Sequence, residues 1–180
     1  MTNKNLGLYL HIPFCDAKCS YCNFYSMAGC ASQKELYKNA LLKELKQWGE
    51  KVFRPITSIY IGGGTPSAMK KEFLLEILNC VKTNFTVLDN AEITVEVNPK
   101  SASLPLFSAL KEAGVNRISI GVQSGNDDEL KTLGRLHDKK TAEETYFAAR
   151  KAGIENISLD LMLGLPNSTL DTKQIGRAHV

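Results

Sequence analysis

The sequence predicts an α/β protein built on a parallel sheet, and three observations support this prediction. Five short apolar segments recur along the 180 residues. Each is followed by an amphipathic stretch with helical spacing of its apolar residues, or by a loop that leads to one. Alternation of this kind produces βα units joined by right-handed crossovers. Because no linker or low-complexity stretch interrupts the series, we expect one domain or part of a larger one.

The candidate strands share one pattern, in which apolar and polar residues alternate. They are Leu8–Ile12, Ser58–Ile61, Ile93–Val97, Arg117–Val122 and Asn156–Leu161. A parallel strand that is covered on both faces is normally apolar throughout. Here we expect the apolar face of each strand to pack under helices, while the other face is polar toward the carboxyl ends. A satisfied core polar group is the better interpretation for any one strand, but five strands in phase favour a shared interior site at the end where βα barrels place their chemistry.

Four amphipathic segments are the candidate helices between these strands. They are Glu35–Trp48, Lys71–Val81, Leu104–Ala113 and Thr141–Ala152. The last two are followed directly by Gly114 and Gly153. Glycine commonly occupies the left-handed position that ends a helix, so both glycines predict helix C-caps.

Composition and charge exclude several classes of protein. The net charge of +3 is too small and too dispersed to predict binding to nucleic acid. No apolar run approaches the ~20 residues that cross a bilayer, and Met1–Leu6 is polar, without the apolar core of a signal peptide. An odd number of cysteines, five, argues against a disulfide framework. We therefore expect a cytoplasmic protein that meets membranes only through partner proteins.

Three of the cysteines lie in one short loop directly after the first strand. Cys15, Cys19 and Cys22 have the spacing C-x3-C-x2-C, whereas Cys30 and Cys80 fall outside it and are interpreted as ordinary thiols. A structural zinc site requires four ligands, which His11 would complete. In a [4Fe–4S] cluster, three thiolates leave one iron open to a small molecule. The spacing favours the iron–sulfur cluster and leaves zinc as the alternative.

With Tyr21 just before its last cysteine, this motif resembles the signature of the radical S-adenosylmethionine (SAM) superfamily. The resemblance extends from about Gly7 to Leu170. It is greatest to oxygen-independent coproporphyrinogen III oxidases and to radical SAM haem chaperones of the HemW type. It implies a partial (β/α)6 radical SAM barrel that stops after its fifth strand, a [4Fe–4S] cluster on the three cysteines, and SAM on the open iron.

The same resemblance implies which residues contact SAM. They are Tyr9, Tyr21, Gly63, Gly64, Thr65, Glu96, Gln123, Arg135 and Asp160. The glycine turn would present carbonyls to the amino group of SAM, and Arg135 would help to hold its carboxylate. A structural salt bridge is the alternative role for Glu96. His11 has no assigned role, and His137 is expected at the solvent.

One position separates the two related branches. The oxidases commonly have a fourth cysteine two residues after the third, and here that residue is Phe24. Gly125 departs from the family, which usually has an aromatic residue there. We therefore favour a haem chaperone that binds haem, passes it to acceptor proteins and receives electrons from a donor. The alternatives are SAM-dependent oxidative decarboxylation of coproporphyrinogen III and a zinc-binding barrel without a redox role.

The last six residues, Ile175–Val180, match the translation of a common sequencing-adapter read, and Gln174 is compatible with its preceding bases. We therefore interpret residues 1–174 as an incomplete radical SAM core domain and residues 175–180 as a non-native tail. By the family pattern, a sixth strand and a C-terminal domain are then absent. Because the family's haem-binding motif lies in that domain, haem binding is expected of the full-length protein.

Overall fold

The computed structural model of the chain describes residues 5–166 and 168, so the predicted tail 175–180 lies outside the described residues. Its main sheet has five parallel strands in the order β1-β4-β5-β6-β7. The strands are β1 (Leu6–Ile12), β4 (Ile56–Gly63), β5 (Val87–Val97), β6 (Arg117–Gln123) and β7 (Asn156–Leu161). Spatial order follows chain order, so each crossover joins neighbouring strands, as in a βα barrel that has not closed. The predicted parallel α/β fold is confirmed.

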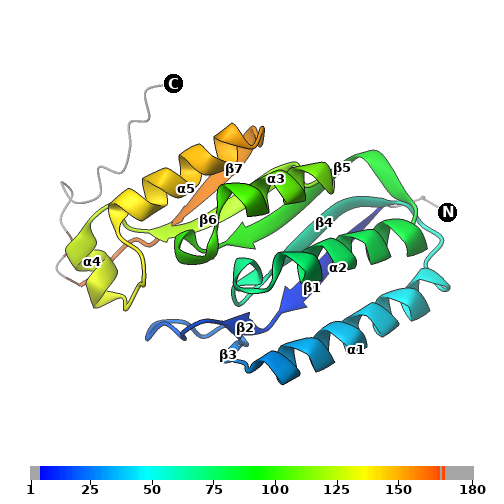
Figure 1. The fold of residues 1–180 in the computed structure, drawn as a ribbon, viewed down its shortest axis with the longest axis horizontal. Coiled ribbons are helices and arrows are strands. Elements are labelled where there is room, and N and C mark those ends of the chain that lie inside the picture. The colour runs from blue at the N-terminus through cyan, green and yellow to red at the C-terminus, as the bar shows by residue number, and fades with distance from the viewer. Residues whose placement is uncertain (1–4, 167, 169–180) are drawn as a thin grey trace.

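Four helices lie side by side along one face of this sheet (Figure 1). They are α1 (Ala31–Gly49), α2 (Lys71–Asn84), α3 (Leu104–Glu112) and α5 (Lys139–Lys151). The apolar strand faces pack against them, and Ile59, Ile61 and Leu74 are buried almost completely. Gly114 and Gly153 follow α3 and α5 with φ of +90° and +82°, which confirms both predicted C-caps.

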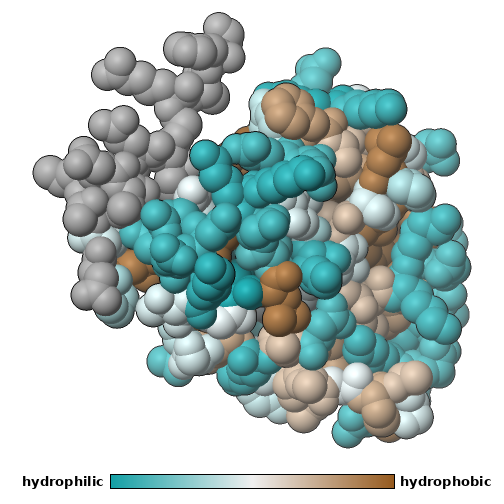
Figure 2. Space-filling view, turned by 60° about the vertical axis from the view of Figure 1, so that its left-hand side comes forward, coloured by the Kyte–Doolittle hydropathy of each residue, from teal (hydrophilic) through white to brown (hydrophobic). Residues whose placement is uncertain are grey.

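The apolar face of β7 departs from the prediction. Leu159 and Leu161 are 41% and 42% exposed instead of packed under a helix. β7 is an edge strand, and no helix follows it in residues 162–166. Figure 2 is turned so that the side of the molecule with the strand ends comes forward, and it shows hydrophobic residues in separate patches among hydrophilic ones. The alternating pattern therefore predicts which residues share a face of each strand, but it does not predict whether a helix covers that face.

Short elements gather at the carboxyl ends of the strands (Figure 1). They are β2 (Phe14–Cys15), β3 (Met27–Ala28), the 3-10 turns η1 (Pro66–Ala68) and η2 (Pro99–Ser101), and α4 (Asp127–Thr132). None has the length or periodicity that predicts an element from sequence. Together they build the surroundings of the site. Across the part of the chain that the structure describes, no helix has both the length and the hydrophobicity needed to cross a membrane.

Candidate functional site

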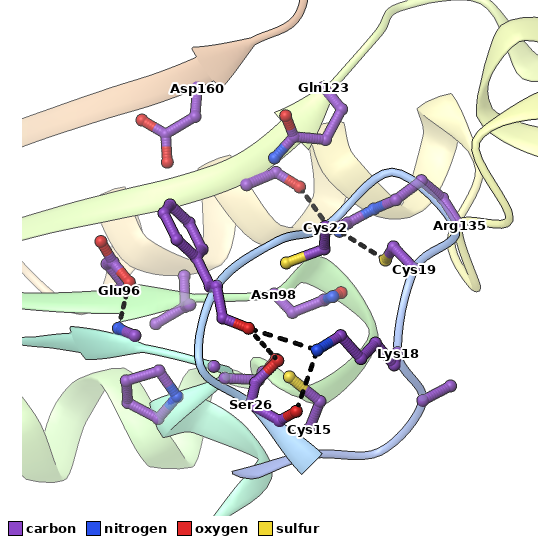
Figure 3. Close-up of a pocket in the computed structure, with 18 of the residues that line it drawn as sticks. Cys15, Lys18, Cys19, Cys22, Ser26, Glu96, Asn98, Gln123, Arg135 and Asp160 are labelled. Carbon is purple, nitrogen blue, oxygen red and sulfur yellow. Dashed lines mark hydrogen bonds between the residues drawn. The ribbon is translucent and has the colours of Figure 1, made fainter. Parts of the chain in front are cut away.

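A cavity of about 470 Å³ lies where the strands end, between them and the cysteine loop (residues 13–29). This volume is in the range of small-molecule sites. Every predicted site residue except Tyr9 lines it: Cys15, Cys19, Tyr21, Cys22, Gly63, Gly64, Thr65, Glu96, Gln123, Arg135 and Asp160. Figure 3 shows side chains of the cysteine loop facing Glu96, Gln123 and Asp160, which lie toward the ends of their strands. The predicted meeting of strand ends and cysteine loop is thus present in the structure.

The cysteine loop is closed by main-chain contacts. Its two ends pair as β2 and β3, with Cys15 opposite Ala28. The glycine turn after β4 docks on its entrance, where the amides of Gly64 and Thr65 donate to the carbonyls of Ile12 and Phe14 over 2.8 and 2.7 Å. A Cβ on Gly64 would lie 2.7 Å from the Phe14 oxygen, so only glycine permits this approach. Because these amides are occupied, the turn has carbonyls rather than amides to offer a ligand.

The three loop thiols are free and partly buried, and all border the cavity (Figure 3). Among the described residues, no group of three or more His, Cys, Asp or Glu side chains is arranged to hold a single metal ion. His11, the fourth ligand of the zinc alternative, has both ring nitrogens within hydrogen-bond distance of other groups, the Tyr9 hydroxyl and the Tyr25 carbonyl. Three thiols without a free fourth ligand match a [4Fe–4S] cluster with one open iron better than a closed tetrahedral zinc site.

The Lys18 side chain connects two segments of the cysteine loop by hydrogen bonds, a role that the sequence did not predict. Its ammonium donates to the carbonyls of Phe24 and Ser26 over 3.3 and 3.2 Å, and it lines the cavity (Figure 3). These bonds join the segment between the first two cysteines to the segment after the third. A basic residue within a cysteine motif was the available signal. It also adds a positive charge to the lining of the cavity that the three thiols border.

Glu96 is held by hydrogen bonds and not by the salt bridge considered as its alternative. The Tyr60 hydroxyl donates to one carboxylate oxygen over 2.7 Å, and the Gly63 amide donates to the other over 2.9 Å. Burial and the Glu96 carboxylate raise the pKa of Tyr60 well above its usual value, so its hydroxyl remains a donor. Gly63 has φ of +119°, and a Cβ there would lie 2.5 Å from the His11 ring. The glycine turn therefore fixes Glu96 as well as the loop.

Arg135 reaches the cysteine loop from the segment after α4. One terminal nitrogen donates to the Tyr21 hydroxyl over 3.3 Å and lies 3.6 Å from the Cys19 sulfur, while the other donates to the Gly121 carbonyl over 2.7 Å. Its Nε is buried without a hydrogen-bond partner among the described residues. Burial raises the pKa of Tyr21, although the Arg135 guanidinium opposes that shift. The guanidinium thus lies between the thiols and the end of β6.

The ends of β6 and β7 place Gln123 and Asp160 at the opposite side of the cavity (Figure 3). Gln123 has φ of +71°, an unusual conformation for a residue with a side chain. Its carbonyl accepts from the Met162 amide over 2.9 Å, where the pairing of β6 with β7 changes register. The Asp160 carboxylate accepts from the Ser119 hydroxyl over 2.9 Å. Backbone strain of this kind is often found at binding sites.

One histidine prediction is wrong, and one predicted site residue lies outside the cavity lining. Tyr9 is not among the residues that line this cavity, but its ring stacks on that of Tyr60, which does, with 6.1 Å between the ring centroids. Its hydroxyl bonds to His11, and its contact with SAM stays a prediction. His137 is not at the solvent but only 5% exposed, with Nε2 donating to the Val122 carbonyl over 3.1 Å. Loop packing, which leaves no periodic pattern, buries this ring.

Comparison with known proteins supports the arrangement. The family model described as the radical SAM superfamily matches residues 9–177. Heme chaperone HemW of Haemophilus influenzae is 40% identical over 172 residues, which cover 92% of this chain and 45% of that protein. HemW of Bacillus subtilis is 42% identical over 164 residues, covering 90% of this chain and 43% of the relative. The chain thus spans less than half the length of these curated relatives.

A solved structure shows the same architecture. The chain is similar to the coproporphyrinogen III oxidase HemN from Escherichia coli, described as a radical SAM enzyme, with a TM-score of 0.86 and 30% sequence identity. The match covers 93% of this chain and 39% of that one. The five-stranded sheet and its helices therefore correspond to part of a radical SAM barrel.

Proposed function

Because this chain belongs to the radical SAM superfamily, we propose that Cys15, Cys19 and Cys22 hold a [4Fe–4S] cluster and that the adjoining cavity binds SAM. When bound, these cofactors supply a one-electron cleavage of a carbon–sulfur bond. The observation that carries the proposal is the convergence of three free thiols with the glycine turn, two carboxylates and a guanidinium on one cavity.

Each part of SAM has a chemically matched group in this cavity. Glu96, Asp160 and the carbonyls of the glycine turn are acceptors suited to an ammonium group and to ribose hydroxyls. The Arg135 guanidinium, with its unpartnered buried Nε, is suited to a carboxylate. Lys18 and the docked glycine turn maintain the loop geometry that the thiols require.

For the whole protein we propose the role of a haem chaperone, which binds haem and transfers it to acceptor proteins. An electron donor is a further proposed partner. The identity of about 40% to HemW proteins supports this role. Phe24, which stands where the oxidases commonly have a fourth cysteine, supports it as well. Its side chain is 67% exposed and borders the cavity, so that position contributes a hydrophobic surface and no thiolate.

The second candidate is oxidative decarboxylation of coproporphyrinogen III, favoured by the structural similarity to HemN. The two candidates share the cluster and SAM, so the fold does not separate them. They differ in what happens to a porphyrin. A chaperone retains haem without altering it, whereas an oxidase converts a porphyrinogen.

The deciding experiment is anaerobic reconstitution of the full-length protein with iron and sulfide, followed by two assays. Haem is titrated and followed by its absorption, and coproporphyrinogen III is incubated with SAM and a chemical reductant. We expect about four irons and four sulfides per chain, haem binding and no porphyrinogen conversion. Porphyrinogen conversion would favour the oxidase, and bound zinc without labile sulfide would contradict both candidates.

A further inference from the structure

We propose that Asp160 is oriented for the ligand of the cavity by a directed hydrogen-bond chain that begins at Arg117 and passes through Ser158 and Ser119. The inference rests on the proposed function, because the ligand is SAM. It assigns a positioning role to Arg117, Ser119 and Ser158, which lie on the sheet face that is not covered by helices. None of these three lines the cavity itself.

Strand geometry brings the four residues together. Arg117 and Ser119 are two apart on β6, and Ser158 and Asp160 are two apart on β7. Ser119 is opposite Ser158 in the parallel pairing of these strands. Residues two apart on a strand share a face, so all four side chains lie on the face that does not pack against the helices. The series of hydrogen bonds therefore runs from the middle of this sheet face toward the carboxyl ends of the strands, where Asp160 borders the cavity.

The distances form an unbroken series. A terminal nitrogen of Arg117 lies 3.0 Å from the Ser158 hydroxyl oxygen, the two serine oxygens are 2.9 Å apart, and the Ser119 hydroxyl lies 2.9 Å from Asp160 Oδ1. All three distances are within the normal range for hydrogen bonds. Ser119 is buried, and the Arg117 side chain is only 24% exposed, so water has limited access to the start of the series.

The chemistry of the groups fixes the direction of every bond. A guanidinium only donates and a carboxylate only accepts. The single hydroxyl proton of Ser119 is used on Asp160, so Ser119 must accept from Ser158. The proton of Ser158 is thereby used on Ser119, and Ser158 accepts from Arg117. One cation, two hydroxyl groups and one anion are thus aligned head to tail, an arrangement in which each bond strengthens the next.

The consequence is a carboxylate whose position is fixed before the ligand arrives. Asp160 is at an exposed strand end, where an unsupported side chain would sample several rotamers. The Ser119 bond occupies one oxygen and leaves the other to accept from SAM. Ordering the group in the free protein lowers the entropy lost on binding.

The test measures SAM affinity of the reconstituted 180-residue chain by equilibrium dialysis. We expect Ser119→Ala to weaken binding about five- to tenfold and Ser158→Ala about two- to threefold, because the latter removes a supporting bond only. Thr94→Val is the matched control. The Thr94 hydroxyl also bonds to Arg117, but it has no place in the path to Asp160, so we expect a change of less than about twofold.

A double-mutant cycle separates positioning from a general structural effect. In the Asp160→Ala background, Ser119→Ala should have no further effect on SAM affinity, since its only contribution is through the missing carboxylate. An equal loss in both backgrounds would overturn the proposal. So would a loss in Thr94→Val as large as that in Ser119→Ala.

A second measurement does not depend on SAM. Side-chain NMR couplings of Asp160 in the cofactor-free chain should indicate one χ1 rotamer, and rotamer averaging after Ser119→Ala. If the wild-type chain binds no SAM but Asp160 is ordered by Ser119, the proposed function fails while the hydrogen-bond chain stands. If SAM binds and Asp160 averages in the wild type, the hydrogen-bond chain is refuted and the proposed function stands.

Discussion

The two sides of the cavity are held by different kinds of contact. On the cysteine side, the loop is fixed mainly by main-chain hydrogen bonds, between β2 and β3 and from the glycine turn to Ile12 and Phe14, and the Lys18 side chain adds two bonds to loop carbonyls. On the strand side, other side chains hold the functional groups, as Tyr60 holds Glu96 and Ser119 holds Asp160, with one main-chain bond added from the Gly63 amide to Glu96. The first arrangement fixes the path of the backbone, and the second fixes individual functional groups.

This difference predicts different sensitivity to substitution. Contacts made by the main chain survive most side-chain changes, but they fail when an added Cβ has no space. Contacts made by side chains are lost one at a time, each with the modest free energy of one hydrogen bond. On the cysteine side, substitutions at a few positions should therefore abolish the site. On the strand side, substitutions at many positions should each weaken ligand binding by a small amount.

The largest expected effect is loss of the cluster from the cysteine side. Cys19→Ser replaces a thiolate ligand with a hydroxyl, which is a poor ligand for iron–sulfur clusters. We expect iron and acid-labile sulfide to fall to near background after anaerobic reconstitution. Cys30→Ser is the matched control, because Cys30 is the N-cap residue of α1 and lies outside the cavity. Equal losses from both variants would show that iron is bound nonspecifically.

The second prediction concerns the backbone of the same side. Gly63→Ala combines φ of +119° with a Cβ placed 2.5 Å from the His11 ring, so we expect it to lower the free energy of unfolding by about 2–4 kcal/mol. Gly134→Ala is the control, with φ of +68° and no atom within 4 Å of the added Cβ. It should cost about 1 kcal/mol. Urea denaturation measures both values, and similar losses would mean that the close approach to His11 is unimportant.

The same contrast explains what the sequence could predict. Strands, helices and the two glycine caps leave periodic or local signals, and the structure confirms them. The cavity lining was also anticipated, since cysteine spacing and strand ends are local features that topology brings together. The burial of His137 depends on loop packing, which has no period. Lys18 donates to the main-chain carbonyls of Phe24 and Ser26. Every residue has such a carbonyl, so the sequence does not indicate which ones accept.

A third prediction tests the residue that connects the two sides. Arg135 contacts Gly121 from the strand side and both Tyr21 and Cys19 from the loop. Arg135→Lys keeps the charge but loses the planar set of donors, so we expect SAM affinity to fall about tenfold. Arg150→Lys on α5 is the matched control, since its contacts are to Tyr146 and Glu155 at the surface. Unchanged SAM affinity in Arg135→Lys would remove Arg135 from the proposed site.

The smallest expected effect is a pH dependence on the strand side. Burial, and secondly the Arg135 guanidinium, lower the pKa of His137 below its ordinary value of about 6.5. The folded chain therefore binds this proton less readily than the unfolded chain does. His137 contributes its full stability above about pH 6.5, and the contribution is lost as the pH falls through the lowered pKa of the folded state.

Substitution of His137 isolates this effect from that of the carboxylates. His137→Gln removes the titrating ring, so the wild-type free energy of unfolding should fall more steeply than that of the variant below about pH 6.5. Urea denaturation of the cluster-free chain between about pH 5 and pH 8 measures both curves. The two curves should run parallel above this range of titration and converge below it, because protonation weakens the packing that the variant already lacks. Curves that stay parallel throughout would show that protonation of the buried ring costs no stability. The loop that carries Arg135 and His137 would then be less rigid than the hydrogen bond from His137 to Val122 indicates.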